Sequence, residues 1–448
     1  MVNQRMIKTA LLTVVGLSVV MVVTSSLVHP QITPDEVPSF GDRSLYDTAI
    51  LRTVFLDFER DSWERDLEAY YHTDVEVPAR LTMDGKVYEG VGVSFRGNTS
   101  YREVPRGQKR SLNLSIDFKD DEQRLLGYRS LNLLNSNQDP TFLRSYLYLY
   151  VSRQYIAAPK ANFVRVVING EDWGVYVNIQ QVNGDFMKET FDSRKGARWK
   201  VSGSGRGMRG GLAYLGENPL AYWSLYDIKS DDVEESWDAL INLTRVLNGT
   251  PFDQLPAAIE PILDVDATLR FLALDKAFQN NDGYWTKGGD YYVVMNKDGV
   301  FRPVPWDANE TWREIEGGRG GSFAYRAQLD PFDGANDTDK ALLYRLLRVE
   351  SYQQRYLAYL RDIAENWLDW DRLAPVIEEA HRVIGDAVEA DDRKLYSTDS
   401  FLSGVFRDSA AGYGRSSPPS MSLMSFATER REYLLNYPAV REAPPLPK

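Results

Sequence analysis

Two acidic loop segments stand at the two ends of one predicted β-hairpin. Asp282 follows a predicted helix and Asp307 follows the hairpin, whose strands are expected at Tyr291–Met295 and Val300–Val304. A hairpin brings its two ends together, so both carboxylates are expected to face the same space. Carboxylates held close together suit a hard cation such as Mg²⁺, which prefers oxygen ligands. Without a metal the same pair would form an acid and a base, and both segments also fit ordinary turn chemistry.

The amino-acid composition excludes several kinds of catalytic and metal site. The chain has no cysteine, which excludes thiolate nucleophiles, disulfides and zinc sites built on Cys. Its only histidines are His29, His72 and His381, so a three-histidine metal site is not expected and a Ser-His-Asp triad would need His72 or His381. The formal net charge of -12 argues against a nucleic-acid partner. A nucleotide site in so acidic a chain needs a local basic group and a metal.

The elements that must position these loops follow an α+β pattern. Residues 46–201 favour strands, with hairpin turns at Asp84-Gly85 and Asn169-Gly170. Residues 202–437 favour helices, and we expect them at 233–247, 266–279, 340–367 and 373–389. The sequence therefore predicts a sheet-rich N-terminal lobe and a mainly helical C-terminal lobe that carries the metal site.

Both ends of the chain differ from its middle. Residues 1–29 place Arg5 and Lys8 before an apolar run, which is typical of a signal peptide or a membrane anchor. Either would leave the rest of the chain outside the cytoplasm, secreted or anchored by one segment, because positive charges stay inside. Residues 30–45 contain prolines and are interpreted as a linker, and the proline-rich residues 438–448 are predicted to be disordered.

The stretch 279–312 resembles the signature of the CotH family, the spore-coat protein H kinases. In that family an Asn/Asp-rich loop precedes a Tyr-Tyr strand, and a Pro-x-Asp-x-Asn/Asp segment follows the hairpin. Here these motifs are residues 281–283, 290–292 and 305–310. Upstream, residues 92–100 resemble the family's Arg/Lys-Gly-Asn-Ser segment, and Lys109 matches a lysine position of the family. The resemblance covers roughly Thr53 to Tyr433, and the order of several motifs makes it specific.

The resemblance implies an atypical protein-kinase-like fold that transfers phosphate from ATP to Ser/Thr hydroxyls of a protein substrate, with Mg²⁺ or Mn²⁺. It implies that Asp282 orients or deprotonates the acceptor hydroxyl and that Asp307 binds the metal. Asn309 would be a second metal contact, and Lys109 would contact the ATP phosphates. Lys200, just before a glycine- and arginine-rich stretch, is a further candidate for the nucleotide site. Such roles agree with phosphoryl transfer, which needs alignment and charge neutralisation rather than covalent help.

Three departures from the family pattern leave other functions open. Gln180 stands where many members have a Glu, which would pair with the ATP lysine, so nucleotide binding would be weaker and a pseudokinase is an alternative. Asp290 stands where many members have Asn, and Asn309 where many have a second Asp. A catalytically inactive envelope binding or assembly protein is therefore one alternative. A carbohydrate-active hydrolase with paired carboxylates is another, given the 10 Trp and 26 Tyr.

Overall fold

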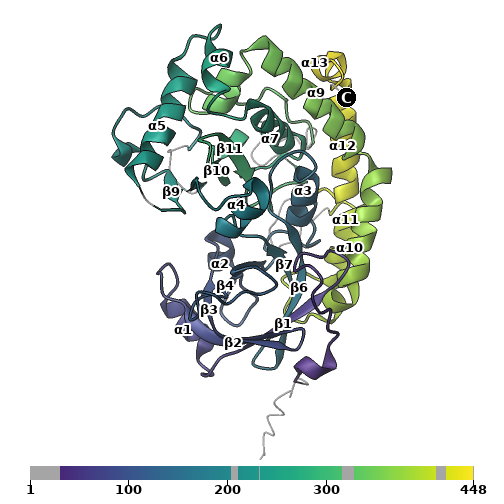
Figure 1. Ribbon diagram of the computed structural model, residues 1–448. Helices are drawn as coiled ribbons and strands as arrows, with labels where there is room; N and C mark the ends of the chain where they lie inside the picture. The colour runs from purple at the N-terminus through teal and green to yellow at the C-terminus, as the bar shows by residue number, and fades with distance from the viewer. Residues whose placement is uncertain (1–30, 203–209, 232, 315–326, 410–419, 447–448) are drawn as a thin grey trace, which may run out of the picture.

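The computed structural model describes residues 31–202, 210–231, 233–314, 327–409 and 420–446. Figure 1 shows a β-barrel at one end of the molecule and a larger, mostly helical part at the other. The predicted signal or anchor segment, residues 1–29, lies outside the described residues. Within the described ranges, no helix is both long and apolar enough to cross a membrane.

Seven strands close the barrel in the order β1-β2-β3-β4-β5-β7-β6. Neighbours are antiparallel except β1 and β6, which pair in parallel and complete the closure. Apolar side chains such as Val54, Val93 and Leu114 fill its own core. The strands are β1 (Arg52–Asp57), β2 (Val77–Met83), β3 (Lys86–Phe95), β4 (Leu112–Ser115), β5 (Ser130–Leu134), β6 (Ala161–Ile168) and β7 (Glu171–Ile179).

The two tight turns expected from the sequence form as predicted. Asp84 and Gly85 have φ values of 53° and 73° between β2 and β3, and Asn169 and Gly170 have 49° and 81° between β6 and β7. Positive φ at both central residues is the turn geometry whose twist matches that of the flanking strands. The α+β class is thus confirmed, whereas closure of the sheet into a barrel was not expected.

A second, four-stranded sheet lies in the helical part, in the order β11-β10-β8-β9. Its strands are β8 (Ala197–Val201), β9 (Tyr226–Ile228), β10 (Tyr291–Met295) and β11 (Phe301–Pro305). The predicted hairpin is β10 and β11, with Tyr291 opposite Pro305. Because β8 pairs with β10, the last strand before residue 202 belongs to this sheet rather than to the barrel.

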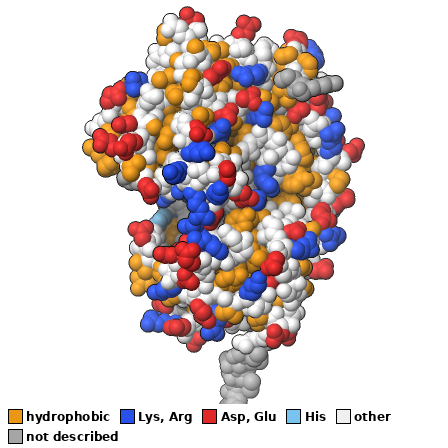
Figure 2. Space-filling model, in the orientation of Figure 1, with side chains coloured by type: hydrophobic (Ala, Val, Ile, Leu, Met, Phe, Trp, Pro, Cys, Tyr) orange, Lys and Arg blue, Asp and Glu red, His pale blue; other side chains and the backbone are white. Residues whose placement is uncertain are grey.

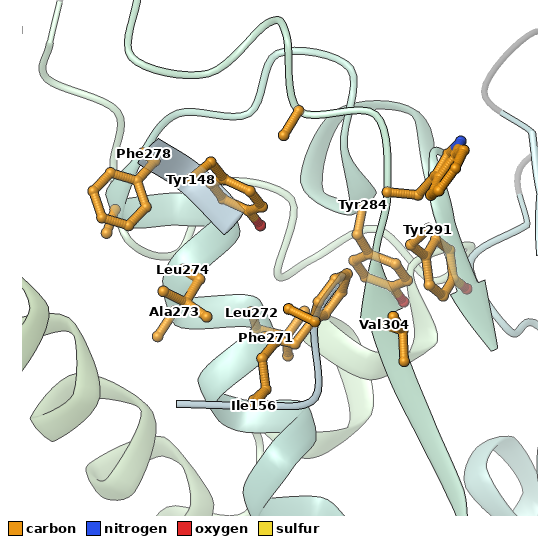
Figure 3. Close-up of a cluster of buried hydrophobic side chains, with 14 of the residues drawn as sticks. Tyr148, Ile156, Phe271, Leu272, Ala273, Leu274, Phe278, Tyr284, Tyr291 and Val304 are labelled. Carbon is orange, nitrogen blue, oxygen red and sulfur yellow. The ribbon is translucent and has the colours of Figure 1, made fainter. Parts of the chain in front are cut away.

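Helices surround the second sheet and continue along one side of the barrel, where α10 packs on β7 (Figure 1). Figure 3 shows the core where α7 brings Phe271 and Leu274 together with Tyr148 of α3 and Tyr291 of β10. The helices are α1 (Trp63–Ala69), α2 (Thr99–Glu103), α3 (Arg144–Ser152), α4 (Gly184–Phe191), α5 (Glu234–Gly249), α6 (Leu255–Ile259), α7 (Val265–Ala277), α8 (Tyr284–Lys287), α9 (Glu350–Asn366), α10 (Trp370–Ala390), α11 (Thr398–Phe406), α12 (Leu423–Asn436) and α13 (Pro438–Glu442), with short helical turns η1 (Pro34–Glu36), η2 (Pro219–Ala221) and η4 (Leu342–Leu346).

The helix expected over 340–367 is instead two elements. The short turn η4 ends at Leu346, Val349 is extended, and α9 starts at Glu350. A glutamate in the first turn favours a helix start there, because it complements the positive end of the helix dipole.

The two end segments are more ordered than the sequence indicated. In the predicted disordered tail, Pro438 opens α13, and Val440 is fully buried. Proline suits the first position of a helix, so a proline-rich tail is compatible with one. The last residues of the predicted linker are packed against the barrel. Leu45 is fully buried in the barrel core, and the Arg52 guanidinium donates hydrogen bonds to the carbonyls of Arg43 and Ser44.

Candidate functional site

A cleft of about 200 Å³ collects the polar loop ends of the barrel and of the second sheet. Its barrel side includes residues 96–100 after β3 and residues 134–139 at and after the end of β5. Its other side carries Asp282, Lys287 and Asp290 before β10, and Asp307, Asn309 and Glu310 after β11. Figure 2 shows this face of the molecule hollowed between the two parts, with Lys and Arg side chains gathered about its middle.

The structure brings Asp282, Asp307 and Asn309 to this one cleft. The register of the hairpin explains how: Tyr291 pairs with Pro305, so the chain enters β10 and leaves β11 at the same end of the sheet. Asp282 forms an ion pair with Lys287, whereas Asp307 lies exposed at the cleft rim.

The loop that carries Asp282 is fixed by a buried carboxylate. Asp275, near the end of α7, accepts a hydrogen bond of 2.9 Å from the backbone N–H of Trp285. Gly283 packs so closely on it that a Cβ there would lie 2.2 Å from Oδ1 of Asp275 and 2.6 Å from Nδ2 of Asn280. Burial raises the pKa of Asp275 to about 7. This packing determines where Asp282 stands.

Left-handed backbone conformations are concentrated in the cleft lining. Ser136, Gln138, Asp290 and Asp307 have φ values of 57°, 63°, 52° and 34°. Only Asp and Asn among non-glycine residues visit this region readily, so Ser136 and Gln138 are strained. Backbone strain of this kind persists where surrounding structure enforces it and is common at functional sites.

Two cations, Arg96 and Lys200, stand beside Asp307. Arg96 lines the cleft at the end of β3, and its guanidinium carbon lies 5.3 Å from the centre of the Trp306 ring. The ammonium of Lys200 lies 5.7 Å from the same ring. Burial lowers the pKa of both side chains, and Asp307 opposes this effect in both. Lys200, a candidate from the sequence, thus lies near Asp307 together with Arg96, and a nucleotide contact by Lys200 stays a prediction.

Lys109 lies outside the cleft lining. Its ammonium is completely buried, 2.5 Å from Oδ2 of Asp391 at the end of α10. It also lies 4.7 Å from the centre of the Tyr176 ring. Burial lowers the pKa of Lys109, and Asp391 opposes that shift. A phosphate contact by Lys109 stays a prediction, and this geometry does not favour it, because the ammonium is already paired and sealed from the cleft.

Gln180 does not meet Lys109 either. Its Nε2 donates to Glu189 at 2.9 Å, and its Oε1 accepts from the backbone N–H of Lys160 at 3.1 Å. The pairing of a family glutamate with the ATP lysine therefore has no counterpart at Gln180 in this structure. The partner of Lys109 comes from α10, more than two hundred residues further along the chain, which sequence spacing does not indicate.

The donors at the cleft are oxygen atoms of the kind that Mg²⁺ prefers: the carboxylates of Asp307 and Asp290 and the amide oxygen of Asn309. Among the residues that the structure describes, no three His, Cys, Asp or Glu side chains form a closed metal cage. Magnesium in phosphoryl-transfer enzymes is held by only one or two carboxylates together with substrate phosphates and water. The residues present fit such a site.

Comparison with known proteins shows the family of the chain. The sequence description of the family named CotH kinase protein matches residues 93–434, and the chain belongs to this family. It is 23% identical to inner spore coat protein H of Bacillus subtilis (strain 168) over 372 residues, covering 80% of this chain and 91% of that protein. It is also 28% identical over 184 residues to invasin CotH7 of Rhizopus delemar, covering 37% of this chain and 28% of that protein.

Parts of the cleft could not be predicted from the sequence, because they depend on backbone conformation and on contacts between distant segments. Residues 134–139 contribute Ser136 and Gln138, whose left-handed conformations no residue type announces. Arg96 was part of a recognised segment, yet nothing in the sequence shows that it meets Trp306 from the other half of the molecule. Asp290 was noted only as a departure, although it lines the cleft beside Asp282 and Asp307.

Proposed function

We propose that this protein is a kinase that transfers the γ-phosphoryl group of ATP to Ser or Thr hydroxyls of a protein, with Mg²⁺ or Mn²⁺. The observation that carries the proposal is the meeting of Asp282, Asp307 and Asn309 in one polar cleft of a CotH-family chain. The barrel and the helical part would act as the two lobes of an atypical kinase-like fold, with the cleft between them.

Each residue has a defined part in this reaction. Asp282 accepts the proton of the acceptor hydroxyl, and the hydroxyl oxygen of the acceptor forms a bond to the γ-phosphorus of ATP. The bond between the γ-phosphorus and the bridging oxygen of the β-phosphate breaks at the same time, and ADP leaves. Lys287, ion-paired with Asp282, keeps the carboxylate oriented. Asp307 and Asn309 would hold the divalent cation, which when bound neutralises charge on the phosphates.

The relatives support a location as well as a class. The name of the Bacillus relative places that protein in the inner spore coat. A kinase of this family with an N-terminal apolar segment would act outside the cytoplasm, which is the location we propose for this chain. Its partner would be a protein that offers Ser or Thr acceptors.

Transfer of label from γ-³²P-ATP tests the proposal. The full chain would be incubated with Mg²⁺ and a serine-rich protein, beside Asp282→Asn and Asp307→Asn. Label that enters protein with the wild type and falls at least about 100-fold in both variants would support the two roles. Absence of both label transfer and metal-dependent ATP binding in the wild type would refute the kinase and favour an inactive binding protein.

A further inference from the structure

Two cations, one from the barrel and one from the second sheet, contact the same aromatic ring. Arg96 follows β3 of the barrel, and Lys200 lies on β8 of the second sheet. The Arg96 guanidinium and the Lys200 ammonium lie 5.3 and 5.7 Å from the centre of the Trp306 ring. Trp306 in turn packs edge-on against Tyr292, with ring centres 5.4 Å apart. Trp306 thus lies near both cations beside Asp307, and of the two cations Arg96 lines the cleft itself.

This arrangement is unfavourable for the protein alone. Arg96 and Lys200 are near enough that Arg96 lowers the pKa of Lys200, and burial lowers the pKa of both. The Nη1 atom of Arg96 is sealed from water and has no hydrogen-bond partner among the described residues. A buried donor without a partner is costly, and so are two like charges held near one another. An anion bound between them would offset both costs.

The carboxylates nearby do not supply that anion in the working enzyme. Asp307 and Asp290 both act on Lys200, and Asp307 acts on Arg96. If Asp307 holds a divalent cation, the negative charge of Asp307 is neutralised by that cation. The net charge around Arg96 and Lys200 then becomes strongly positive. The group that completes the balance must then be polyanionic and must reach the cleft, which Arg96 lines.

We infer that Arg96 and Lys200 form a clamp for the polyphosphate of the nucleotide, with Trp306 as the platform that holds both. This inference rests on the proposed function and names the residues that bind its phosphate donor. The Arg96 guanidinium offers a planar fork for two phosphate oxygens, and the Lys200 ammonium adds a point charge. Lys109, paired with Asp391, stays a buried contact between the barrel and α10.

Binding of Mg²⁺-ADP and of inorganic tripolyphosphate, measured by titration calorimetry on the full chain, tests the clamp. Arg96→Gln and Lys200→Gln should each weaken both ligands by about 10–100-fold, the effect of losing one charge-assisted hydrogen bond. Lys229→Gln is the matched control. Lys229 directly follows β9 and lies close to Lys200, but it is ion-paired with Asp227 at 2.6 Å, so its removal should leave binding within about 2-fold.

Arg96→Lys covers the case in which Arg96→Gln does not fold, because it keeps the charge and loses only the fork. It should still weaken tripolyphosphate by several-fold. Wild-type affinity in Arg96→Lys and Lys200→Gln, with nucleotide binding intact, would overturn the clamp and leave the kinase proposal standing. A wild-type chain that binds neither ADP nor tripolyphosphate would overturn both. Weaker tripolyphosphate binding with unchanged ADP binding would also overturn it, since the clamp must act on both.

Discussion

Replacing Gly283 by alanine tests whether the packing behind Asp282 positions it. The backbone of Gly283 has φ -78° and ψ -164°, which alanine adopts freely, so any effect comes from the added methyl group alone. That methyl carbon would lie 2.2 Å from Oδ1 of Asp275 and 2.6 Å from Nδ2 of Asn280. Ordinary contact distances require a movement of about 1 Å.

The size of the effect on rate and stability depends on which group moves to make room for the methyl carbon. Asp275 is 1% exposed and holds the backbone of Trp285, so the carboxylate has little room and the loop of Asp282 must shift instead. Overpacking of a buried site costs about 1–3 kcal/mol of the free energy of unfolding. A misplacement of about 1 Å in a catalytic group costs about 100-fold in rate.

The assay compares the rate of phosphate transfer with the free energy of unfolding in urea. Gly283→Ala should lose about 100-fold in kcat and only about 1–3 kcal/mol of stability. The control is Gly385→Ala, at a position of α10 where an added Cβ meets nothing within 4 Å. It should keep the wild-type rate and gain up to about 1 kcal/mol. A Gly283→Ala protein with both wild-type stability and wild-type rate would refute the positioning role of Asp275.

Three further changes test other parts of the structure. Lys109→Met leaves Asp391 buried without its partner and should cost about 3–5 kcal/mol in urea unfolding; a loss below about 1 kcal/mol would contradict a buried pair. Asp275 has a pKa raised to about 7, so between about pH 4 and pH 7 the folded protein binds more protons than the unfolded chain and loses stability as pH rises. The unfolding temperature of the wild type should therefore fall relative to that of Asp275→Asn from pH 5 to pH 7. If the unfolding temperatures of the two proteins change in parallel with pH, the raised pKa of Asp275 is refuted. Val440→Ala removes apolar contacts of α13 and should cost about 1–2 kcal/mol by thermal unfolding, whereas a disordered tail would show no change.

The strands and turns could be predicted because their signals are local. The pairs Asp84-Gly85 and Asn169-Gly170 specify their own turn geometry, and the flanking strands follow from it. Closure of the barrel depends instead on β1 pairing in parallel with β6, more than a hundred residues away. No local pattern encodes that pairing, so the sequence indicated a sheet but not its closure.

In the candidate site, too, local features could be predicted from the sequence and contacts between distant segments could not. Asp282 and Asp307 were predictable as a pair because one hairpin carries both, and the resemblance to a family gave them roles. Lys109 could be matched by its position in the sequence, but its buried pairing with Asp391 of α10 depends on tertiary packing. The contact of Arg96 after β3 with Trp306 after β11 likewise depends on tertiary packing.

Metal-dependent phosphate transfer by Asp307→Cys tests the central claim most directly. The chain has no cysteine, so this variant carries one thiol and no background from others. If Asp307 holds the metal, label transfer from ATP should be lost in Mg²⁺, which avoids sulfur, and partly restored in Cd²⁺, which binds it. A variant that transfers phosphate in Mg²⁺ at the wild-type rate would contradict the account, because Asp307 would then have no part in holding the metal.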